Sequence, residues 1–234
     1  MQGLTRKLSF ASAFLRQRDY DEVRAILHSK LWYTEQALGL RRDLSLPFVA
    51  PDALIPMTVR PVLAADIRIM LDVNEMGISR EERRDRAIRL HLANAGFAHC
   101  YVAVTEGNRP CFIQWVMLPS ENRILHRAFN GLFPPLARDE VLLEGAYTPA
   151  AFRGRRIMPA AMALIAEAAG EFGATRVITF VGSENTPSLK GCKRAGFVPY
   201  ATRRAVHRFG YRQTTFSPLP LGTPFPFDLP GASG

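Results

Sequence analysis

The stretch of sequence that decides the fold is VLLEGAYTPAAFRGRRIMPAAMALIAEAAGEF, which runs from residue 141 to residue 172. Its apolar start, residues 141–147, predicts a buried β-strand. Its second half keeps apolar residues at helical spacing from Ile157 to Phe172 and predicts a helix. The segment between them is therefore a turn that leads from a strand into a helix.

That turn is rich in arginine: Arg153, Arg155 and Arg156 surround Gly154. The first backbone N–H groups of a helix have no partner within the helix, and the helix dipole adds partial positive charge at the same place. Pro159 falls in the first turn, where its missing N–H costs little. The turn is therefore suited to a phosphate or diphosphate, and the arginines strengthen that expectation.

Further strands and helices are expected on both sides of this unit. The expected strands are residues 57–61, 98–105, 111–118, 177–181, 197–200 and 205–211, and the expected helices are residues 64–73, 79–94 and 185–195. Ser79 and Glu82 predict a capping box for the second of these helices, and its many Arg and Glu residues predict a face in water. Residues 119–139 are expected to be irregular.

The chain is predicted to have three parts. Residues 1–56 form an extension, with a basic amphipathic helix, an extended piece at 31–44 and a proline-containing linker. Residues 57–215 form the main domain, and residues 216–234 form a Pro/Gly-rich tail that is disordered or loosely draped. The extension either lies on an anionic membrane surface as a peripheral contact, packs on the main domain, or contacts a second subunit in a homodimer.

The charge balance indicates an anionic partner. Lys and Arg number 30 against 21 Asp and Glu, so the formal net charge is +9. Such a surplus suits a phosphorylated cofactor, an acidic acyl-carrier protein or a membrane surface. Nucleic acid is not expected, because helix-turn-helix, zinc-finger and RNP-like patterns are missing. The alternative is that arginine reflects composition alone.

The remaining composition favours a cytoplasmic protein. The three cysteines, Cys100, Cys111 and Cys192, indicate a reducing compartment rather than a disulfide framework. The sequence lacks an apolar run of about 18 residues, so no transmembrane segment is expected, and no signal peptide is expected either. The five histidines show no metal-ligand spacing, so no metal is predicted.

Two motifs occur together. RGRRIM, residues 153–158, forms the turn, and NTPSLKGCKRAGF, residues 185–197, follows the next strand. This pairing resembles the GNAT superfamily of acyl-CoA-dependent N-acyltransferases, over about residues 57–212 and most specifically over 141–197. The resemblance implies an α/β fold with a central mixed, mostly antiparallel sheet of about six or seven strands flanked by helices, here with an N-terminal helix and strand extension.

The resemblance also implies a site. In this superfamily the fourth and fifth strands splay apart, the pantetheine arm of coenzyme A pairs with the fourth, and the turn holds the diphosphate. The implied binding residues for acetyl-CoA or another acyl-CoA are Ala146, Tyr147, Thr148, Arg153, Gly154, Arg155, Arg156, Ile157, Met158, Asn185 and Ser188. The sequence departs from the pattern at Arg156 and Met158, where small residues are usual, and these side chains are expected to crowd the turn.

Two residues are candidates for proton transfer. Glu144 lies in an otherwise apolar strand, where loss of solvation raises the pKa of a carboxyl group and suits a base; the alternative is an ion pair with an arginine across the sheet. Cys192 stands where the superfamily often has a general-acid tyrosine. Its alternative is a buried, inert thiol.

The function that follows from the resemblance is N-acyl transfer, most simply N-acetyl transfer, from acyl-CoA to a primary amine of a small molecule or sugar. Residues 1–56 resemble an extension of GNAT-like proteins associated with bacterial surface-polysaccharide enzymes. One alternative is an acyl-carrier-protein-dependent enzyme that makes a long-chain N-acyl product. Another is a non-catalytic binding module with the same fold.

Overall fold

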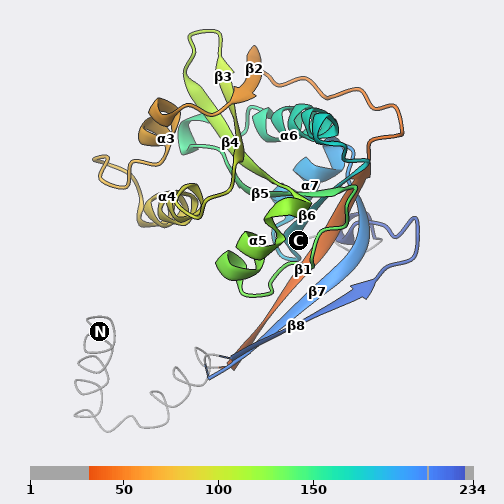
Figure 1. Cartoon of the computed structure of the whole chain (residues 1–234). Coiled ribbons are helices and arrows are strands. Elements are labelled where there is room, and N and C mark those ends of the chain that lie inside the picture. Colours follow the sequence, from red (N-terminus) through yellow and green to blue (C-terminus); the bar gives the residue numbers. More distant parts are fainter. Residues whose placement is uncertain (1–31, 210, 230–234) are drawn as a thin grey trace, which may run out of the picture. The chain divides into compact units, whose positions relative to one another are not determined.

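The computed structural model describes residues 32–209 and 211–229, so the helix expected within residues 1–30 lies outside the described residues. Figure 1 shows the strands and helices along the chain. The strands are β1 (Trp32–Asp43), β2 (Met57–Pro61), β3 (His99–Thr105), β4 (Pro110–Met117), β5 (Glu140–Tyr147), β6 (Arg176–Gly182), β7 (Val198–Arg208) and β8 (Tyr211–Pro218). The α-helices are α3 (Ala64–Met70), α4 (Arg80–Ala93), α5 (Asn122–Phe129), α6 (Ile157–Ala168) and α7 (Thr186–Arg194), and short 3-10 helices are η1 (Pro119–Glu121), η2 (Ala150–Phe152), η3 (Ala169–Phe172) and η4 (Pro226–Asp228).

The described strands form one sheet in the order β2-β3-β4-β5-β6-β1-β7-β8. β5 and β6 run parallel, whereas the pairs β2–β3, β3–β4, β4–β5 and β1–β6 are antiparallel. This mixed, mostly antiparallel sheet flanked by helices confirms the predicted fold class. It has eight strands rather than six or seven, and one of them, β1, comes from the segment predicted as an N-terminal extension.

The chain folds as two compact units. The described part of the smaller unit comprises residues 32–36, 204–209 and 211–215, and in it Tyr33 stacks on His207 with ring centroids 4.1 Å apart. The larger unit comprises residues 37–203 and 216–229 within the described ranges. The cavities and the candidate site lie in this larger unit.

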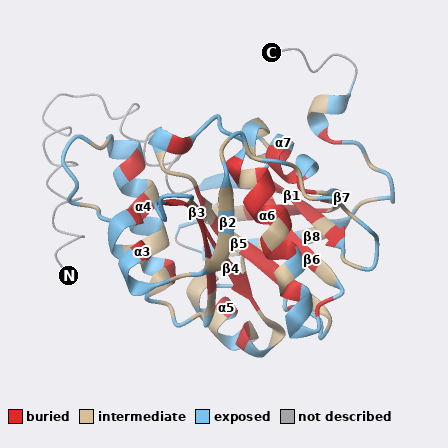
Figure 2. Ribbon diagram, turned by 90° about the horizontal axis from the view of Figure 1, so that it is seen from above, coloured by how far each residue is buried: buried red, intermediate tan, exposed pale blue. Residues whose placement is uncertain are grey.

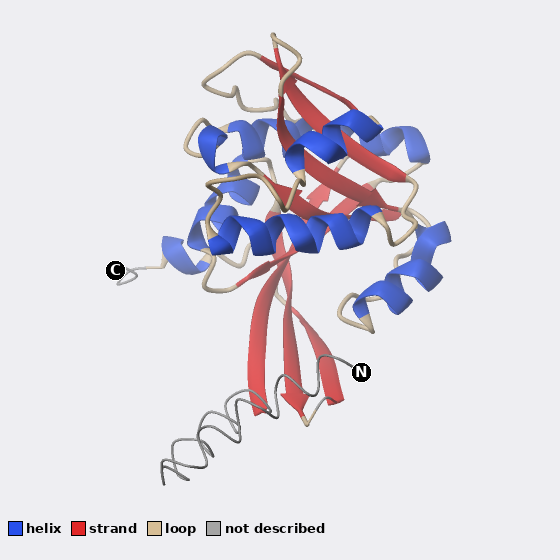
Figure 3. Ribbon diagram, turned by 90° about the vertical axis from the view of Figure 1, so that its left-hand side faces the viewer, coloured by secondary structure: helices blue, strands red, loops and turns tan. Residues whose placement is uncertain are grey.

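Two clusters of apolar side chains pack the sheet of the larger unit against its helices. Figure 3 shows these helices lying against the strands. One cluster joins the sheet to α6, for example through Ala161 and Ile165. The other joins it to α4 and α5 through Leu92 and Leu125. Figure 2 shows the buried residues running along the strands and α6. The sheet therefore separates two layers of helices.

β5 and β6 separate part-way along their length. Their parallel pairing joins residues 140–142 to residues 176–178, whereas β5 continues to Tyr147 and β6 to Gly182. A bulge bends β5 in the same region, because Trp115 pairs with Glu144 while Ile113 pairs with Tyr147. The strands therefore diverge toward their carboxyl ends, as the resemblance implied.

Gly145 makes this bulge possible. Its φ is +70°, and a Cβ atom built on it would lie 2.6 Å from Cδ1 of Leu92 and 2.8 Å from Cε3 of Trp115. A left-handed backbone and this lack of space both exclude a side chain. The glycine in the otherwise apolar strand is thus a requirement of the bend.

Three sequence predictions differ from the structure. Residues 119–139 contain α5, whose Leu125 is buried, so the expectation of irregular structure was wrong over that helix. The expected strands at 197–200 and 205–211 are replaced by the continuous strand β7, which ends at Arg208, and by β8, which begins at Tyr211. In the tail, Phe225 is buried and Lys193 pairs with Asp228 at 2.8 Å, so this part is packed rather than loosely draped.

Candidate functional site

A cavity of about 660 Å³ lies where β5 ends, next to the turn before α6 and beside α4 and α7. All eleven residues that the resemblance implied as the donor site line it: Ala146, Tyr147, Thr148, Arg153, Gly154, Arg155, Arg156, Ile157, Met158, Asn185 and Ser188. The structure thus gathers residues from three separate stretches of sequence around one cavity. Neither proton-transfer candidate, Glu144 or Cys192, is part of the lining.

The turn before α6 has the geometry of an anion-binding loop. Gly154 has φ +79° and open space where a Cβ would be, and Arg156, the N-cap of α6, has φ +56°. A positive φ at this position explains why a glycine is usual there. The N–H groups of Ile157 and Met158 begin the helix and have no partner within it. The cavity therefore borders the positive end of the α6 dipole.

The charge around the cavity is predominantly positive. Five arginines and two carboxylates line it. Among the residues that the structure describes, no ion pair involves Arg155, Arg156 or Arg194, and all three side chains are exposed. Cationic side chains of this kind, beside a helix start, favour an anionic ligand.

Arg153 differs from its neighbours in the turn. Its Nη2 donates to Oε2 of Glu82 at 2.8 Å and lies 3.7 Å from Oδ2 of Asp85, and its Nε donates to the carbonyl oxygen of Thr148 at 3.2 Å. Both carboxylates belong to α4. Arg153 is therefore bonded to α4, a helix on the other face of the sheet from α6.

The inward-facing side chains of α4 do not follow from its sequence pattern. Ser79 does accept the N–H of Glu82 at 3.0 Å, as a helix cap should. The Glu82 carboxylate, however, turns inward, and Glu82 and Arg86 are only 4% and 6% exposed, so the predicted solvated face was wrong at these positions. The only sequence signal was the capping pattern, which explains a glutamate there without indicating what its side chain contacts.

Glu82 and Arg86 meet at Tyr147, the last residue of β5. The Tyr147 hydroxyl donates to Oε1 of Glu82 and accepts from Nε of Arg86 at 3.0 Å. Burial, and then the Glu82 carboxylate, raise the pKa of Tyr147 to about 12, while Arg86 opposes the rise. Tyr147 is therefore protonated at neutral pH and its hydroxyl is already engaged.

A second α4 arginine reaches the same strand. Nη2 of Arg89 donates to the carbonyl oxygen of Ala146 at 3.0 Å, and its Nη1 lies 3.1 Å from Oδ1 of Asp85. Arg89 lines the cavity, and its positive charge also acts on Glu144. It thus connects the free end of β5 with the carboxyl group of Glu144 on that strand.

The candidates on α7 occupy its first turn. Asn185 is the N-cap of α7, and its Oδ1 accepts the N–H of Ser188 at 3.2 Å. Both residues line the cavity from the start of α7. Because the side-chain oxygen Oδ1 of Asn185 accepts this capping bond, the side-chain NH₂ group is the polar group that Asn185 could offer to a ligand.

Glu144 lies beside Trp115 on the sheet, on the face covered by α4 and α5. Burial raises the pKa of its carboxyl group, and this is partly offset by a hydrogen bond from the N–H of Gly145 and by the charges of Arg89 and Arg203. The predicted direction of the shift therefore agrees with the structure. Its position outside the cavity lining leaves the catalytic role a proposal.

Cys192 lies in the core. Its side chain is 1% exposed, and its thiol contacts the sulfur of Met162 at 3.8 Å. Burial raises the pKa of this thiol to about 12. The structure therefore places Cys192 in apolar surroundings, as in the alternative of a buried thiol, and outside the cavity lining.

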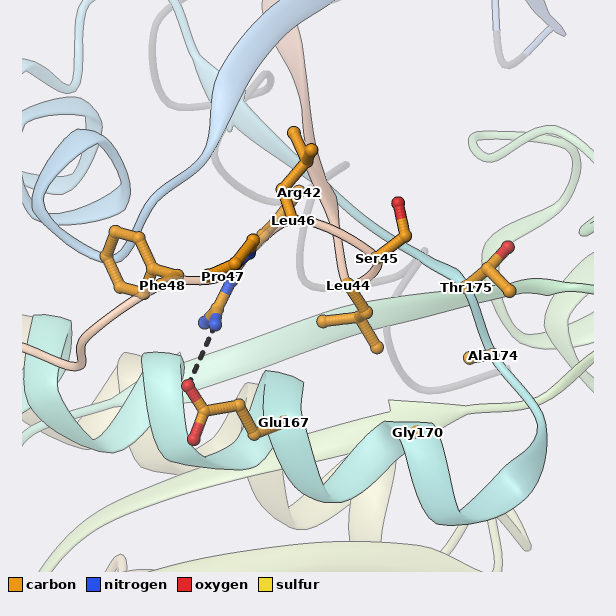
Figure 4. A pocket seen from close by; sticks show the side chains of 10 residues that line it. All are labelled: Arg42, Leu44, Ser45, Leu46, Pro47, Phe48, Glu167, Gly170, Ala174 and Thr175. Carbon is orange, nitrogen blue, oxygen red and sulfur yellow. Dashed lines mark hydrogen bonds and ion pairs between the residues drawn. The ribbon is translucent and has the colours of Figure 1, made fainter.

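A second cavity, of about 440 Å³, lies between the segment after β1 and the end of α6 (Figure 4). Arg42 points into it from β1, and its Nη2 lies 2.9 Å from Oε1 of Glu167. Its Nη1 donates to the carbonyl oxygen of Ala163 at 3.0 Å. The charge of Arg42 is thus balanced within the fold, and this cavity has no helix start beside it.

None of the described helices has the length and apolar character needed to cross a membrane. Across the described part of the chain, no group of three or more His, Cys, Asp or Glu side chains is arranged to hold a metal ion.

Comparison with known proteins adds to this geometry. No protein-family model and no curated protein matches the sequence. Among solved structures, the chain is similar to a GCN5-related glucosamine N-acetyltransferase region of a fungal multi-domain β-N-acetylglucosaminidase, with a TM-score of 0.51 and 15% identity over 80% of this chain and 22% of that one. The chain has the GNAT fold.

Two further solved structures to which the chain is similar are described as GNAT proteins. A GCN5-related N-acetyltransferase from Sphaerobacter thermophilus has a TM-score of 0.49 and 14% identity over 84% of this chain. A GNAT-family acetyltransferase from Colwellia psychrerythraea has a TM-score of 0.48 and 15% identity over 76% of this chain. This chain spans 57% of the length of each of these two GNAT proteins.

Proposed function

We propose that the protein is an N-acyltransferase that moves an acyl group, most simply acetyl, from acyl-CoA to a primary amine. The observation that carries this proposal is the course of the 660 Å³ cavity, which joins the start of α6 to the free end of β5. One end suits a diphosphate, and the other offers a stretch of β5 that β6 does not pair with. Coenzyme A has both a diphosphate and an amide-containing arm.

The donor would bind in two parts. Its diphosphate would accept hydrogen bonds from the N–H groups at the start of α6, with Arg155 and Arg156 supplying positive charge. Its pantetheine amides would pair with β5 near residues 145–148, where β6 no longer occupies that edge. The thioester would then lie near Ala146 and Tyr147.

The reaction would be a direct transfer. The amine nitrogen attacks the thioester carbonyl carbon, a C–N bond forms, the C–S bond breaks, and the thiolate leaves and takes up a proton. A backbone N–H of β5 near Ala146 is suited to the oxyanion of the tetrahedral intermediate. Alignment of the two reactants and exclusion of water supply much of the acceleration.

Glu144 is the proposed base for the amine. Its carboxyl group has a raised pKa and lies on β5 two residues before Ala146, and Arg89 acts on it from the cavity wall. A carboxylate with a raised pKa is a stronger base than one in water. Because Glu144 is outside the cavity lining, the proton would pass to it through a water molecule, or the acceptor would have to move slightly toward it.

The acceptor is proposed to be a small molecule with a primary amine. The fungal region of similar fold is described as a glucosamine N-acetyltransferase. Amino sugars are therefore the first acceptors to test on this chain, followed by other small amines. Two carboxylates of α4, Glu81 and Asp85, line the cavity. Asp85 already pairs with Arg89 at 3.1 Å, so Glu81 is the carboxylate that would favour a cationic acceptor.

Isothermal titration of the full chain with CoA tests the donor. We expect binding at about micromolar Kd, with on the order of tenfold or more weakening in the Arg155→Ala/Arg156→Ala double variant. Release of CoA from acetyl-CoA, followed with a thiol reagent across a panel of amines, tests transfer. Binding of an acyl-carrier protein with no binding of CoA would support the carrier-protein enzyme instead, and binding of neither would remove the proposal.

A further inference from the structure

Of the three arginines in the turn, Arg153 already has partners. Its guanidinium bonds to Glu82, lies near Asp85 and donates to the carbonyl oxygen of Thr148. Its side chain is 48% exposed, so it borders the cavity while it is held from behind. No ion pair holds Arg155 or Arg156 among the described residues.

The partner carboxylate is buried and fully engaged. Glu82 is 4% exposed and accepts hydrogen bonds from Tyr147, from the N–H of Ala150 at 3.3 Å and from Arg153, and Arg86 lies 3.8 Å from it. Three of these groups belong to the segment that leads from β5 to α6. One side chain of α4 therefore holds this segment at residues 147, 150 and 153.

Moving Arg153 onto a ligand would leave this arrangement incomplete. A buried carboxylate that loses a charged partner suffers a large penalty, because little solvent can replace the lost interaction. An incoming diphosphate could bind Arg155 and Arg156 without breaking any ion pair. The lower-cost arrangement keeps Arg153 where it is.

We propose that Glu82 and Arg153 form a strut that positions the phosphate turn, and that Arg153 is a positioning residue while Arg155 and Arg156 contact the diphosphate. This rests on the proposed function for its ligand. The strut also joins α4, which lines part of the cavity, to the turn that would hold the donor. The ion pair between the buried Glu82 and the half-exposed Arg153 thereby fixes this helix to the turn.

A double-mutant cycle on the full chain tests the strut. Glu82→Gln, Arg153→Ala and the double variant are compared with the unmodified protein by thermal unfolding without ligand. We expect each single change to lower the Tm by several degrees, and the double variant to lose clearly less than the two losses together. Additive losses would show that the two residues do not act as a pair and would overturn the proposal.

Titration with CoA at several ionic strengths separates positioning from contact. Arg153→Ala and Glu82→Gln should weaken CoA binding by similar factors, and neither should change the dependence of the CoA Kd on salt concentration. Arg155→Ala, the matched control, should leave the Tm unchanged and flatten that dependence, because a screened phosphate contact is lost. Arg153→Lys should recover part of the affinity if the role is to hold the turn.

The opposite results are equally clear. If Arg153 contacts the diphosphate, Glu82→Gln frees it and strengthens CoA binding, and Arg153→Ala flattens the salt dependence. If the unmodified protein does not bind CoA, the proposed function fails, while the Tm cycle still decides whether Glu82 and Arg153 act as a pair. Failure of the strut and failure of the proposed function are thus told apart.

Discussion

The side chain of Met158 occupies the space in front of Gly191: a Cβ atom built on Gly191 would overlap the Met158 sulfur and lie 3.2 Å from its Cε. Met158 stands at a position of the turn before α6 where the resemblance implied a small residue. The glycine on α7 gives this larger side chain a place to pack. The expected crowding of the turn is thus relieved by the neighbouring helix.

Gly191→Ala should push Met158 out of this place and toward the cavity. We expect destabilisation of about 1–3 kcal/mol from overpacking, together with weaker CoA binding. Met158→Ala combined with Gly191→Ala should restore both, measured by thermal unfolding and calorimetric titration. If Gly191→Ala alone leaves Tm and Kd unchanged, the packing between Met158 and Gly191 is looser than the structure indicates.

Gly145→Ala tests the bulge in β5. The added Cβ would meet Leu92 and Trp115, and the residue would keep a left-handed backbone. The two penalties together should cost about 2–4 kcal/mol, seen as a lower midpoint in urea. Gly107→Ala is the control, since its Cβ would meet only Oγ1 of Thr105 at 4.0 Å. Equal midpoints for the two variants would contradict the role given to Gly145.

Glu144→Gln tests both the charge and the chemistry of the buried carboxyl group. Because burial raises its pKa in the folded state, the folded protein binds the proton more tightly than the unfolded chain, whose value is near 4.5. Stability from this group is therefore complete below pH 4.5 and is lost as pH rises above it. The Tm gain of Glu144→Gln over the unmodified protein should be small at pH 4 and larger at pH 8.

The same variant should lower kcat for acetyl transfer at neutral pH while the Kd for CoA stays nearly constant. Glu184→Gln, at an exposed position after β6, serves as the control. A Tm difference that does not change with pH would argue against a buried titrating carboxyl group. Unchanged kcat would remove Glu144 as the base.

The Cys192→Ala variant tests whether Cys192 is an inert thiol of the core or the general acid of the reaction. The thiol is buried against Met162, and its pKa of about 12 keeps it protonated at neutral pH. We expect a modest loss of stability, on the order of 1 kcal/mol, and turnover within about twofold of the unmodified protein. A large fall in kcat with an unchanged Tm would instead identify Cys192 as the proton donor to the leaving thiolate.

The local sequence predicted the fold well where strand and helix patterns were strong. Residues 141–172 produced β5, the turn and α6 as expected, because an apolar run and a helical repeat are read from adjacent positions. The predicted residues that line the cavity came from the motif pair at 153–158 and 185–197 and, at residues 146–148, from the strand before it. These features depend on residues close in sequence, which is why they were accessible.

The partners of α4 could not be predicted in the same way. Glu82 meets Tyr147 and Arg153 across 65 and 71 positions of the chain. A charged helix in sequence is normally a solvated one, and only the folded structure shows which of its carboxylates turns inward. The helix α5 was not predicted, because it has only eight residues and the segments on both sides of it are irregular.

β1 has a consequence for how the protein is made. Residues 37–43 leave the ribosome early, yet they pair with residues 176–182 of β6, which emerge much later. Until that encounter, one side of β6 presents unsatisfied N–H and C=O groups that could recruit another chain. Since distant pairing is slow, the newly synthesised protein passes through a period in which aggregation competes with completion of the sheet.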